Sequence, residues 1–158
     1  METQIEIVAP TALAGGELQA CLKVLKNCEL PQLRAARTQL PRAYRIAVCR
    51  NAGKIIGLGV IKSGLASYAE GVSQESEYPI DPKTPELTYV AVEEEYRGKH
   101  ISSNILGALL ENFPQRPVFA VTSDEKMKAS LQHQGFEPKG CQWENRAGHW
   151  ESLWIKSC

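Results

Sequence analysis

A short basic turn follows an apolar segment and precedes a second apolar segment with helical spacing, and it is suited to binding an anion. Free N–H groups and the positive dipole end of a helix N-terminus receive a phosphate group without needing a large basic patch. Arg97 and Lys99 can add charge-assisted contacts. The alternative is a surface turn with solvated charges, as a lone basic turn usually is. The turn and the positions after it are Arg97, Gly98, Lys99, His100, Ile101, Ser102 and Ser103.

The composition limits the class of protein that could carry such a site. The chain has 158 residues, 43% hydrophobic and 23% charged, which predicts one globular domain over residues 1–158. Its 18 Lys+Arg balance 18 Asp+Glu, which disfavours a nucleic-acid-binding module and a polybasic membrane binder. The sequence shows no secretory leader and no apolar stretch long enough to span a membrane, so we expect a soluble protein.

The cysteines favour a reducing compartment. Five cysteines form an odd set without a C-x-x-C pair, which suggests neither a disulfide framework nor a zinc motif. We therefore expect reduced thiols in the cytoplasm and no metal ion. Cys21 and Cys28 lie seven positions apart on a predicted helix, where buried small hydrophobic side chains are the simpler interpretation.

The elements that must position the turn follow from alternation and from helical spacing. Strands are predicted over residues 4–9, 44–50, 54–61, 86–92, 117–122 and 149–156. Helices are predicted from Leu18, between Pro31 and Pro41, from Ser102 or Ser103 to Pro114, and from Asp124 to Gly135. This order predicts an α/β class fold, an α+β mixed sheet with crossover helices.

Three local patterns bear on a site. Gly57 and Gly59 are spaced like a phosphate-binding G-x-G, but neither a helix nor a third glycine follows, so a bulge or close backbone packing is the preferred interpretation. Asp124 predicts a helix cap, and Gly135 predicts a left-handed helix end. Residues 62–85 show no helical period and predict a long connection that is mobile or functional.

The turn also resembles a loop of a known family. Tyr96-Arg97-Gly98-Lys99-His100-Ile101-Ser102 is similar to the acyl-CoA pyrophosphate loop of the GNAT superfamily of N-acetyltransferases, with the pattern R/Q-x-x-G-x-G/A. The resemblance extends over almost the whole chain, including Tyr89-Val90-Ala91-Val92 before the loop and Gly135-Phe136 after the next helix. It implies a GNAT-like fold, a central twisted and mostly antiparallel sheet of six to seven strands with about four helices.

The resemblance implies how acetyl-CoA would be held as the acyl donor. Main-chain groups of Val90 and Val92 would bind the pantetheine arm like an added strand. Asp124 stands where the family often has an asparagine near the pantetheine, and we rank its helix-cap role first. The pyrophosphate would lie on the main-chain amides of Gly98, Lys99, His100, Ile101, Ser102 and Ser103.

Two positions of the loop depart from the family pattern. His100 and Ser102 stand where glycines are usual, and glycine allows close approach and positive φ. Serine is a mild change, because the family accepts alanine in that place. His100 is the more serious change, and the resemblance implies a narrower loop or weaker CoA binding there.

The resemblance further implies transfer of an acetyl or related acyl group to a primary amine by direct attack. Glu86 lies 11 residues before Arg97, a spacing that resembles that of the strand-borne general base in histone-type members. The other interpretation of Glu86 is a solvated glutamate at a strand start. The Val92 amide would stabilise the developing oxyanion.

The proton donor to the leaving thiolate is left open. Leu131 stands where the family commonly has a tyrosine, four residues before the Gly-Phe pair. The proton could come from Ser130, His133, Tyr89 or water. Alternatively, no dedicated acid is needed, since a thiolate is a good leaving group at neutral pH.

The acceptor and partners are predicted only as classes. Four acidic residues against one basic residue in 63–85 favour a cationic amine, either a small molecule or a peptide. The neutral charge argues against an aminoacyl-tRNA acceptor. Many GNAT relatives are dimers, so a homodimer is among the expectations. The alternative function, motivated by His100 and Leu131, is a catalytically weak acyl-CoA-binding or regulatory GNAT-like protein.

Overall fold

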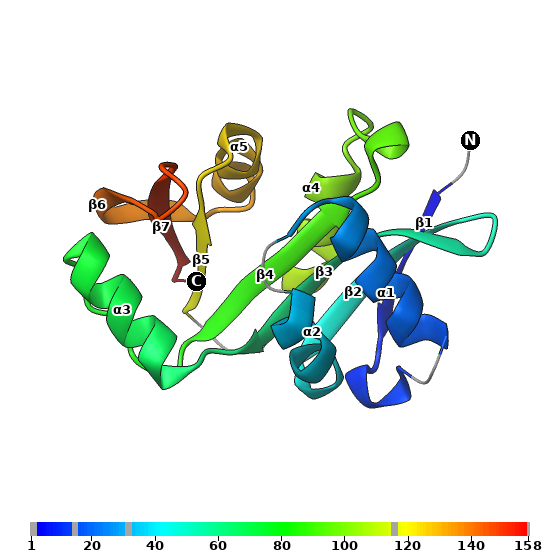
Figure 1. Cartoon of the computed structure of the whole chain (residues 1–158), viewed down its shortest axis with the longest axis horizontal. Helices are drawn as coiled ribbons and strands as arrows, with labels where there is room; N and C mark the ends of the chain where they lie inside the picture. Colours follow the sequence, from blue (N-terminus) through cyan, green and yellow to red (C-terminus); the bar gives the residue numbers. More distant parts are fainter. Residues whose placement is uncertain (1–2, 14–15, 31–32, 115–116, 158) are drawn as a thin grey trace. The chain divides into compact units, whose positions relative to one another are not determined.

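The structure is a computed structural model that describes residues 3–13, 16–30, 33–114 and 117–157 (Figure 1). Within these ranges it has seven strands, hydrogen-bonded in the order β1-β2-β3-β4-β5-β7-β6, and five α-helices. The pairs β1–β2, β2–β3, β5–β7 and β6–β7 are antiparallel, and β4–β5 is parallel. The predicted α/β fold with a mixed, mostly antiparallel sheet is confirmed. The chain divides into two compact units, residues 1–62 with 87–113 and residues 63–86 with 114–158.

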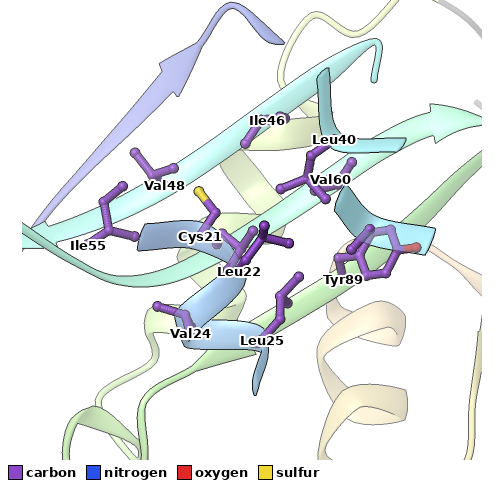
Figure 2. Close-up of a cluster of buried hydrophobic side chains, with 13 residues drawn as sticks. Cys21, Leu22, Val24, Leu25, Leu40, Ile46, Val48, Ile55, Val60 and Tyr89 are labelled. Carbon is purple, nitrogen blue, oxygen red and sulfur yellow. The ribbon is translucent and has the colours of Figure 1, made fainter. Parts of the chain in front are cut away.

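The first unit carries helices α1 and α2 on one face of its strands. These helices pack on β2, β3 and β4 through a buried apolar cluster (Figure 2). The elements are β1 (Thr3–Val8), α1 (Gly16–Asn27), α2 (Leu33–Gln39), β2 (Arg45–Asn51), β3 (Lys54–Ser63), β4 (Pro85–Val92) and α4 (Ile101–Leu110). The cluster comprises Cys21, Leu22, Val24, Leu25, Ala36, Leu40, Ile46, Val48, Ile55, Leu58, Val60, Tyr89 and Ala91.

Cys21 behaves as the small buried hydrophobic residue that its helical spacing predicts. It has no exposed surface, and burial raises the pKa of its thiol to about 11, helped by the negative charge of Glu17. A thiol with this pKa stays protonated at neutral pH and is a poor nucleophile. Cys21 is therefore part of the core.

Gly57 and Gly59 let α4 approach β3 closely. A Cβ atom on Gly59 would lie 2.6 Å from Cγ2 of Ile105 and 2.9 Å from Cδ1 of Leu109. A Cβ on Gly57 would lie 3.2 Å from the carbonyl oxygen of Ala91. The prediction of close backbone packing at the two glycines is confirmed.

The second unit pairs β7 with both β5 and β6. A smaller apolar cluster holds it together, with Val72, Ile80, Phe119, Leu153 and Ile155 at its centre. The elements are α3 (Ala66–Ser76), β5 (Val118–Thr122), α5 (Glu125–His133), β6 (Glu137–Glu144) and β7 (Trp150–Lys156).

Two sequence-based expectations about elements are wrong, and one strand was not predicted. Residues 62–85 contain α3, whose buried positions Ala69, Val72 and Ser76 are small or polar and give little helical signal. The strand β6 was not predicted, because most of its side chains are exposed and it contains a proline and a glycine. Helix α4 begins at Ile101, so neither Ser102 nor Ser103 is its cap. The predicted helix start at Pro31 lies outside the described residues.

Candidate active site

Strand β4 leads into the candidate site and contains a residue in the left-handed region. Tyr89 has φ of 54°, although it lies inside the strand and its side chain is buried. Its hydroxyl donates a hydrogen bond of 2.6 Å to Oε1 of Gln39, the last residue of α2. A non-glycine residue in this region costs of order 1–3 kcal/mol and persists where the surrounding structure imposes it. Tyrosine is typical of ordinary strands, so the sequence carries no signal for this feature.

The last residues of β4 are tied to the turn that follows. The carbonyl oxygen of Val92 accepts a hydrogen bond of 2.9 Å from Nε of Arg97 and one of 3.4 Å from Sγ of Cys28. Asn27 donates a hydrogen bond of 2.9 Å from Nδ2 to Oε1 of Glu93. The Val92 carbonyl oxygen therefore already accepts hydrogen bonds from the protein, so the roles predicted for Val92 would have to be performed by its N–H group.

Val90 and Val92 point toward the α4 face of the strand. Cγ2 of Val90 would lie 3.5 Å from a Cβ on Gly59, and Cγ2 of Val92 would lie 3.3 Å from one on Gly57. The ring of Tyr89, in contrast, belongs to the cluster under α1 and α2. The side chains of the two valines therefore lie on one face of β4, and the Tyr89 ring lies on the other.

The basic turn has the backbone shape of an anion-binding loop. It follows the 3₁₀ turn η3 (Glu94–Tyr96), and Gly98 and His100 have φ of 80° and 62°. His100 is the N-cap residue of α4, and its carbonyl oxygen accepts the N–H of Asn104 at 3.0 Å. His100 therefore adopts the left-handed conformation for which glycine is usual. Successive N–H groups around such residues, and those of a helix's first turn, form concave anion sites.

The charged side chains of the turn are exposed. Arg97, Lys99 and His100 all reach solvent, and Nζ of Lys99 lies 5.9 Å from the centre of the Tyr96 ring. Arg97 is held at Nε by Val92, which leaves its terminal guanidinium nitrogens on the exposed side of the turn. The first unit therefore brings together every predicted donor-binding residue from Val90 to Ser103.

Substitutions at residue 100 test the shape of this turn. We expect His100→Gly to be more stable than His100→Ala by about 1 kcal/mol, because only glycine adopts positive φ without a steric cost. Both variants lack the imidazole, so the difference between their free energies of unfolding reports the cost of positive φ in the backbone. Urea unfolding of the two variants measures it, and equal midpoints would contradict a left-handed residue 100.

Glu86 belongs to the second unit and is buried, which corrects its interpretation as a solvated glutamate. It is 6% exposed and lies opposite Phe119 in the parallel register of β4 and β5. The Tyr68 ring stacks on Phe119 with ring centres 6.3 Å apart. Burial, followed by the negative charges of Glu86 and Glu151, raises the pKa of the Tyr68 hydroxyl. A buried carboxyl group in such surroundings is a candidate proton acceptor.

Asp124 and Leu131 have structural roles in the second unit. Oδ1 of Asp124 accepts the N–H of Lys126 at 3.2 Å, so the predicted helix cap of α5 is confirmed. Leu131 is fully buried, and its carbonyl oxygen accepts the N–H of Phe136 at 3.0 Å. Gly135 has φ of 94°, as predicted for a left-handed helix end.

The structure shows the surroundings of two of the groups that could protonate a thiolate. The Tyr89 hydroxyl donates a hydrogen bond to Oε1 of Gln39 within the first unit. His133 is exposed at the end of α5. Within residues 3–13, 16–30, 33–114 and 117–157, no group of three His, Cys, Asp or Glu side chains is arranged to hold a metal ion.

With the fold and the geometry of the turn described, comparison with known proteins gives the family. A family model described as Acetyltransferase (GNAT) family matches residues 17–136. The chain belongs to this family, whose members transfer acyl groups from acyl-CoA donors. A comparison with curated protein sequences gives no match.

Solved structures share the fold at low sequence identity. A GNAT family acetyltransferase from Streptococcus agalactiae has a TM-score of 0.72 and 12% identity, covering 99% of this chain and 95% of that one. An acyl-CoA N-acyltransferase from Pseudomonas aeruginosa has a TM-score of 0.69 and 11% identity, covering 99% and 100%. An IAA acetyltransferase from Bacillus cereus has a TM-score of 0.65 and 17% identity, covering 99% and 100%. At these identities the likeness concerns the fold alone.

Among the residues that the structure describes, no helix combines the length and the apolar character that a membrane span requires.

Proposed function

We propose that the protein transfers an acetyl group from acetyl-CoA to a primary amine by direct attack. The observation that carries this proposal is the turn between β4 and α4, where Gly98 and His100 are both left-handed just before the first helical N–H groups. We also keep one domain over residues 1–158 as a proposal, because the family match extends over parts of both compact units.

The donor would be held mainly by main-chain groups. Main-chain groups of Val90 and Val92 would pair with the amides of the pantetheine arm as an added strand does. The amides from Gly98 to Ser103 would bind the pyrophosphate, with charge from Arg97 and Lys99. This arrangement lets a chain of zero net charge bind a strongly anionic donor. Asp124 is kept only as a flanking residue, because its carboxylate already caps α5.

The reaction would need one proton acceptor and one oxyanion donor. Glu86, directly or through water, would accept the proton of the amine as its nitrogen attacks the thioester carbon. The Val92 N–H would donate to the carbonyl oxygen as negative charge develops on it. The C–S bond then breaks and CoA leaves as a thiolate, which with an ordinary pKa near 8.5 needs no dedicated acid. This agrees with Leu131 at the position of the family's tyrosine.

The acceptor that we propose is a cationic amine, a small molecule or a peptide. The carboxyl groups of Glu86 and Glu151 both act on Tyr68 of α3, so this part of the second unit carries negative charge. We also propose a cytoplasmic location, from the unpaired cysteines, and no nucleic-acid partner, from the balanced charge. A homodimer, implied by the resemblance, stays a proposal.

Thiol release tests the function. Purified protein is incubated with acetyl-CoA or a longer acyl-CoA and with a panel of amines, comprising a polyamine, an aminoglycoside and a lysine peptide. We expect CoA-thiol release that depends on the amine and is fastest with acetyl-CoA. The protein's own exposed Cys141 sets the background, which a reaction without amine measures.

A calorimetric titration with acetyl-CoA, compared with the thiol-release assay, distinguishes the enzyme from the alternative function. The alternative function is a catalytically weak acyl-CoA-binding or regulatory protein, motivated by His100 in the turn and by the fully buried Leu131 at the position of the family's tyrosine. Binding of acetyl-CoA without amine-dependent release would support this alternative over the enzyme. Absence of both binding and release would contradict both functions.

A further inference from the structure

The strained residue of β4, Tyr89, is joined to α2 by a short hydrogen bond. The Tyr89 hydroxyl donates to Oε1 of Gln39 at 2.6 Å, across 50 positions of sequence. Figure 2 shows the Tyr89 ring at the edge of the buried cluster, with its oxygen pointing away from the other labelled side chains. Tyr89 is 7% exposed, so few water molecules compete for this contact. The hydrogen bond therefore fixes the far end of a side chain whose backbone is left-handed.

The position of this strain indicates that it serves a purpose. Left-handed non-glycine residues persist where neighbouring contacts impose them, and they cluster at active sites. Tyr89 directly precedes Val90, and a left-handed residue in a strand turns the adjoining peptide groups away from the regular ladder direction. The ring is clamped on the α1 and α2 face, whereas the valines face α4. Holding the ring thus sets how the backbone from Val90 to Val92 is presented.

We infer that Gln39 is a positioning residue for acyl-CoA binding, acting through the Tyr89 hydroxyl on the backbone of Val90 and Val92. This inference rests on the proposed function, in which those backbone groups bind the donor. Gln39 itself touches no part of the donor in this scheme. Its side-chain oxygen is the acceptor that keeps the Tyr89 ring in place.

The chemistry requires an acceptor at position 39, and this makes the role testable. Gln39→Leu keeps the approximate size and removes the acceptor. Gln39→Glu keeps a side-chain oxygen in the same place. Tyr89→Phe keeps the ring and removes the donor. Thr38→Ala is the matched control, because the exposed Thr38 hydroxyl donates a hydrogen bond of 3.0 Å to the carbonyl oxygen of Ala35 in its own helix.

The measurements are the dissociation constant of CoA by calorimetry, kcat/KM for acetyl-CoA, and the melting temperature of each variant. Loss of one neutral hydrogen bond predicts about a fivefold weaker affinity for Gln39→Leu and for Tyr89→Phe. The double variant should be no weaker than either single variant, because both remove the same bond. Gln39→Glu and Thr38→Ala should bind CoA as the wild type does.

The outcomes separate this inference from the proposed function. If Gln39→Leu and Tyr89→Phe melt earlier but bind CoA with wild-type affinity, the contact is only structural and the inference is wrong. Additive losses in the double variant, or no rescue by Gln39→Glu, would also overturn it. If the wild-type protein itself binds no CoA, the proposed function fails first and the inference falls with it.

Discussion

The variant Glu86→Gln is expected to lose amine-dependent acetyl transfer by about 10²- to 10⁴-fold in kcat, the usual contribution of a general base. Glutamine has nearly the same shape as glutamate, and Glu86 is only 6% exposed in its strand, so the substitution should preserve packing. The affinity for CoA should stay unchanged, because the residues that we propose to bind the donor lie elsewhere, in β4 beyond Glu86 and in the turn before α4. The loss should therefore fall on the chemical step alone.

The pH dependence gives this prediction a second test. The pH profile of kcat should differ between the wild type and Glu86→Gln, because the variant lacks the carboxylate that would accept the proton of the amine. Glu144→Gln, at an exposed glutamate of β6, is the control and should behave as the wild type. An unchanged rate and an unchanged pH profile in Glu86→Gln would assign the base to another group.

The second large effect is expected on stability, from Gly59→Ala. The added Cβ would lie 2.6 Å from Cγ2 of Ile105 and 2.9 Å from Cδ1 of Leu109. The Ile105 atom is held on a branched Cβ and cannot simply rotate away, so α4 or β3 must shift. Overpacking of this kind costs about 1–3 kcal/mol of the free energy of unfolding. Urea denaturation of the purified variant measures this loss directly.

A second glycine supplies the control for this substitution. Gly71 lies in α3, and a Cβ atom there would meet nothing within 4 Å. Gly71→Ala should leave the free energy of unfolding unchanged or raise it by about 0.5–1 kcal/mol, since alanine favours helix. If Gly59→Ala is as stable as the wild type, α4 does not approach β3 as closely as the structure places it.

Because α4 begins with the proposed pyrophosphate site, Gly59→Ala has a functional consequence as well. A shift of the helix moves the first-turn N–H groups that follow His100. We expect weaker CoA binding in this variant, in proportion to the displacement, whereas Gly71→Ala should bind CoA normally.

The sequence alone determined those features that depend on neighbouring residues. The spacing of Leu18, Cys21, Leu22 and Leu25 predicted α1, because one helical face repeats over short distances. Asp124 and Gly135 marked the ends of α5, because caps act on backbone groups a few positions away. The basic turn between strand and helix was visible for the same reason. These local signals were sufficient to predict the fold class and to indicate the segment that we propose to bind the donor.

Only the tertiary structure decided the features that depend on distant contacts. The left-handed Tyr89 contradicts the local preference of tyrosine, and its ring contacts a helix 50 positions away. Glu86 is buried in the folded chain, where it pairs in register with Phe119 of β5, 33 positions along the sequence. Helix α3 was missed because its buried face is small and partly polar, and tertiary packing, more than apolar periodicity, stabilises it. Local chemistry thus located the turn that would bind the donor, while long-range packing set the backbone strain and the burial of the candidate base.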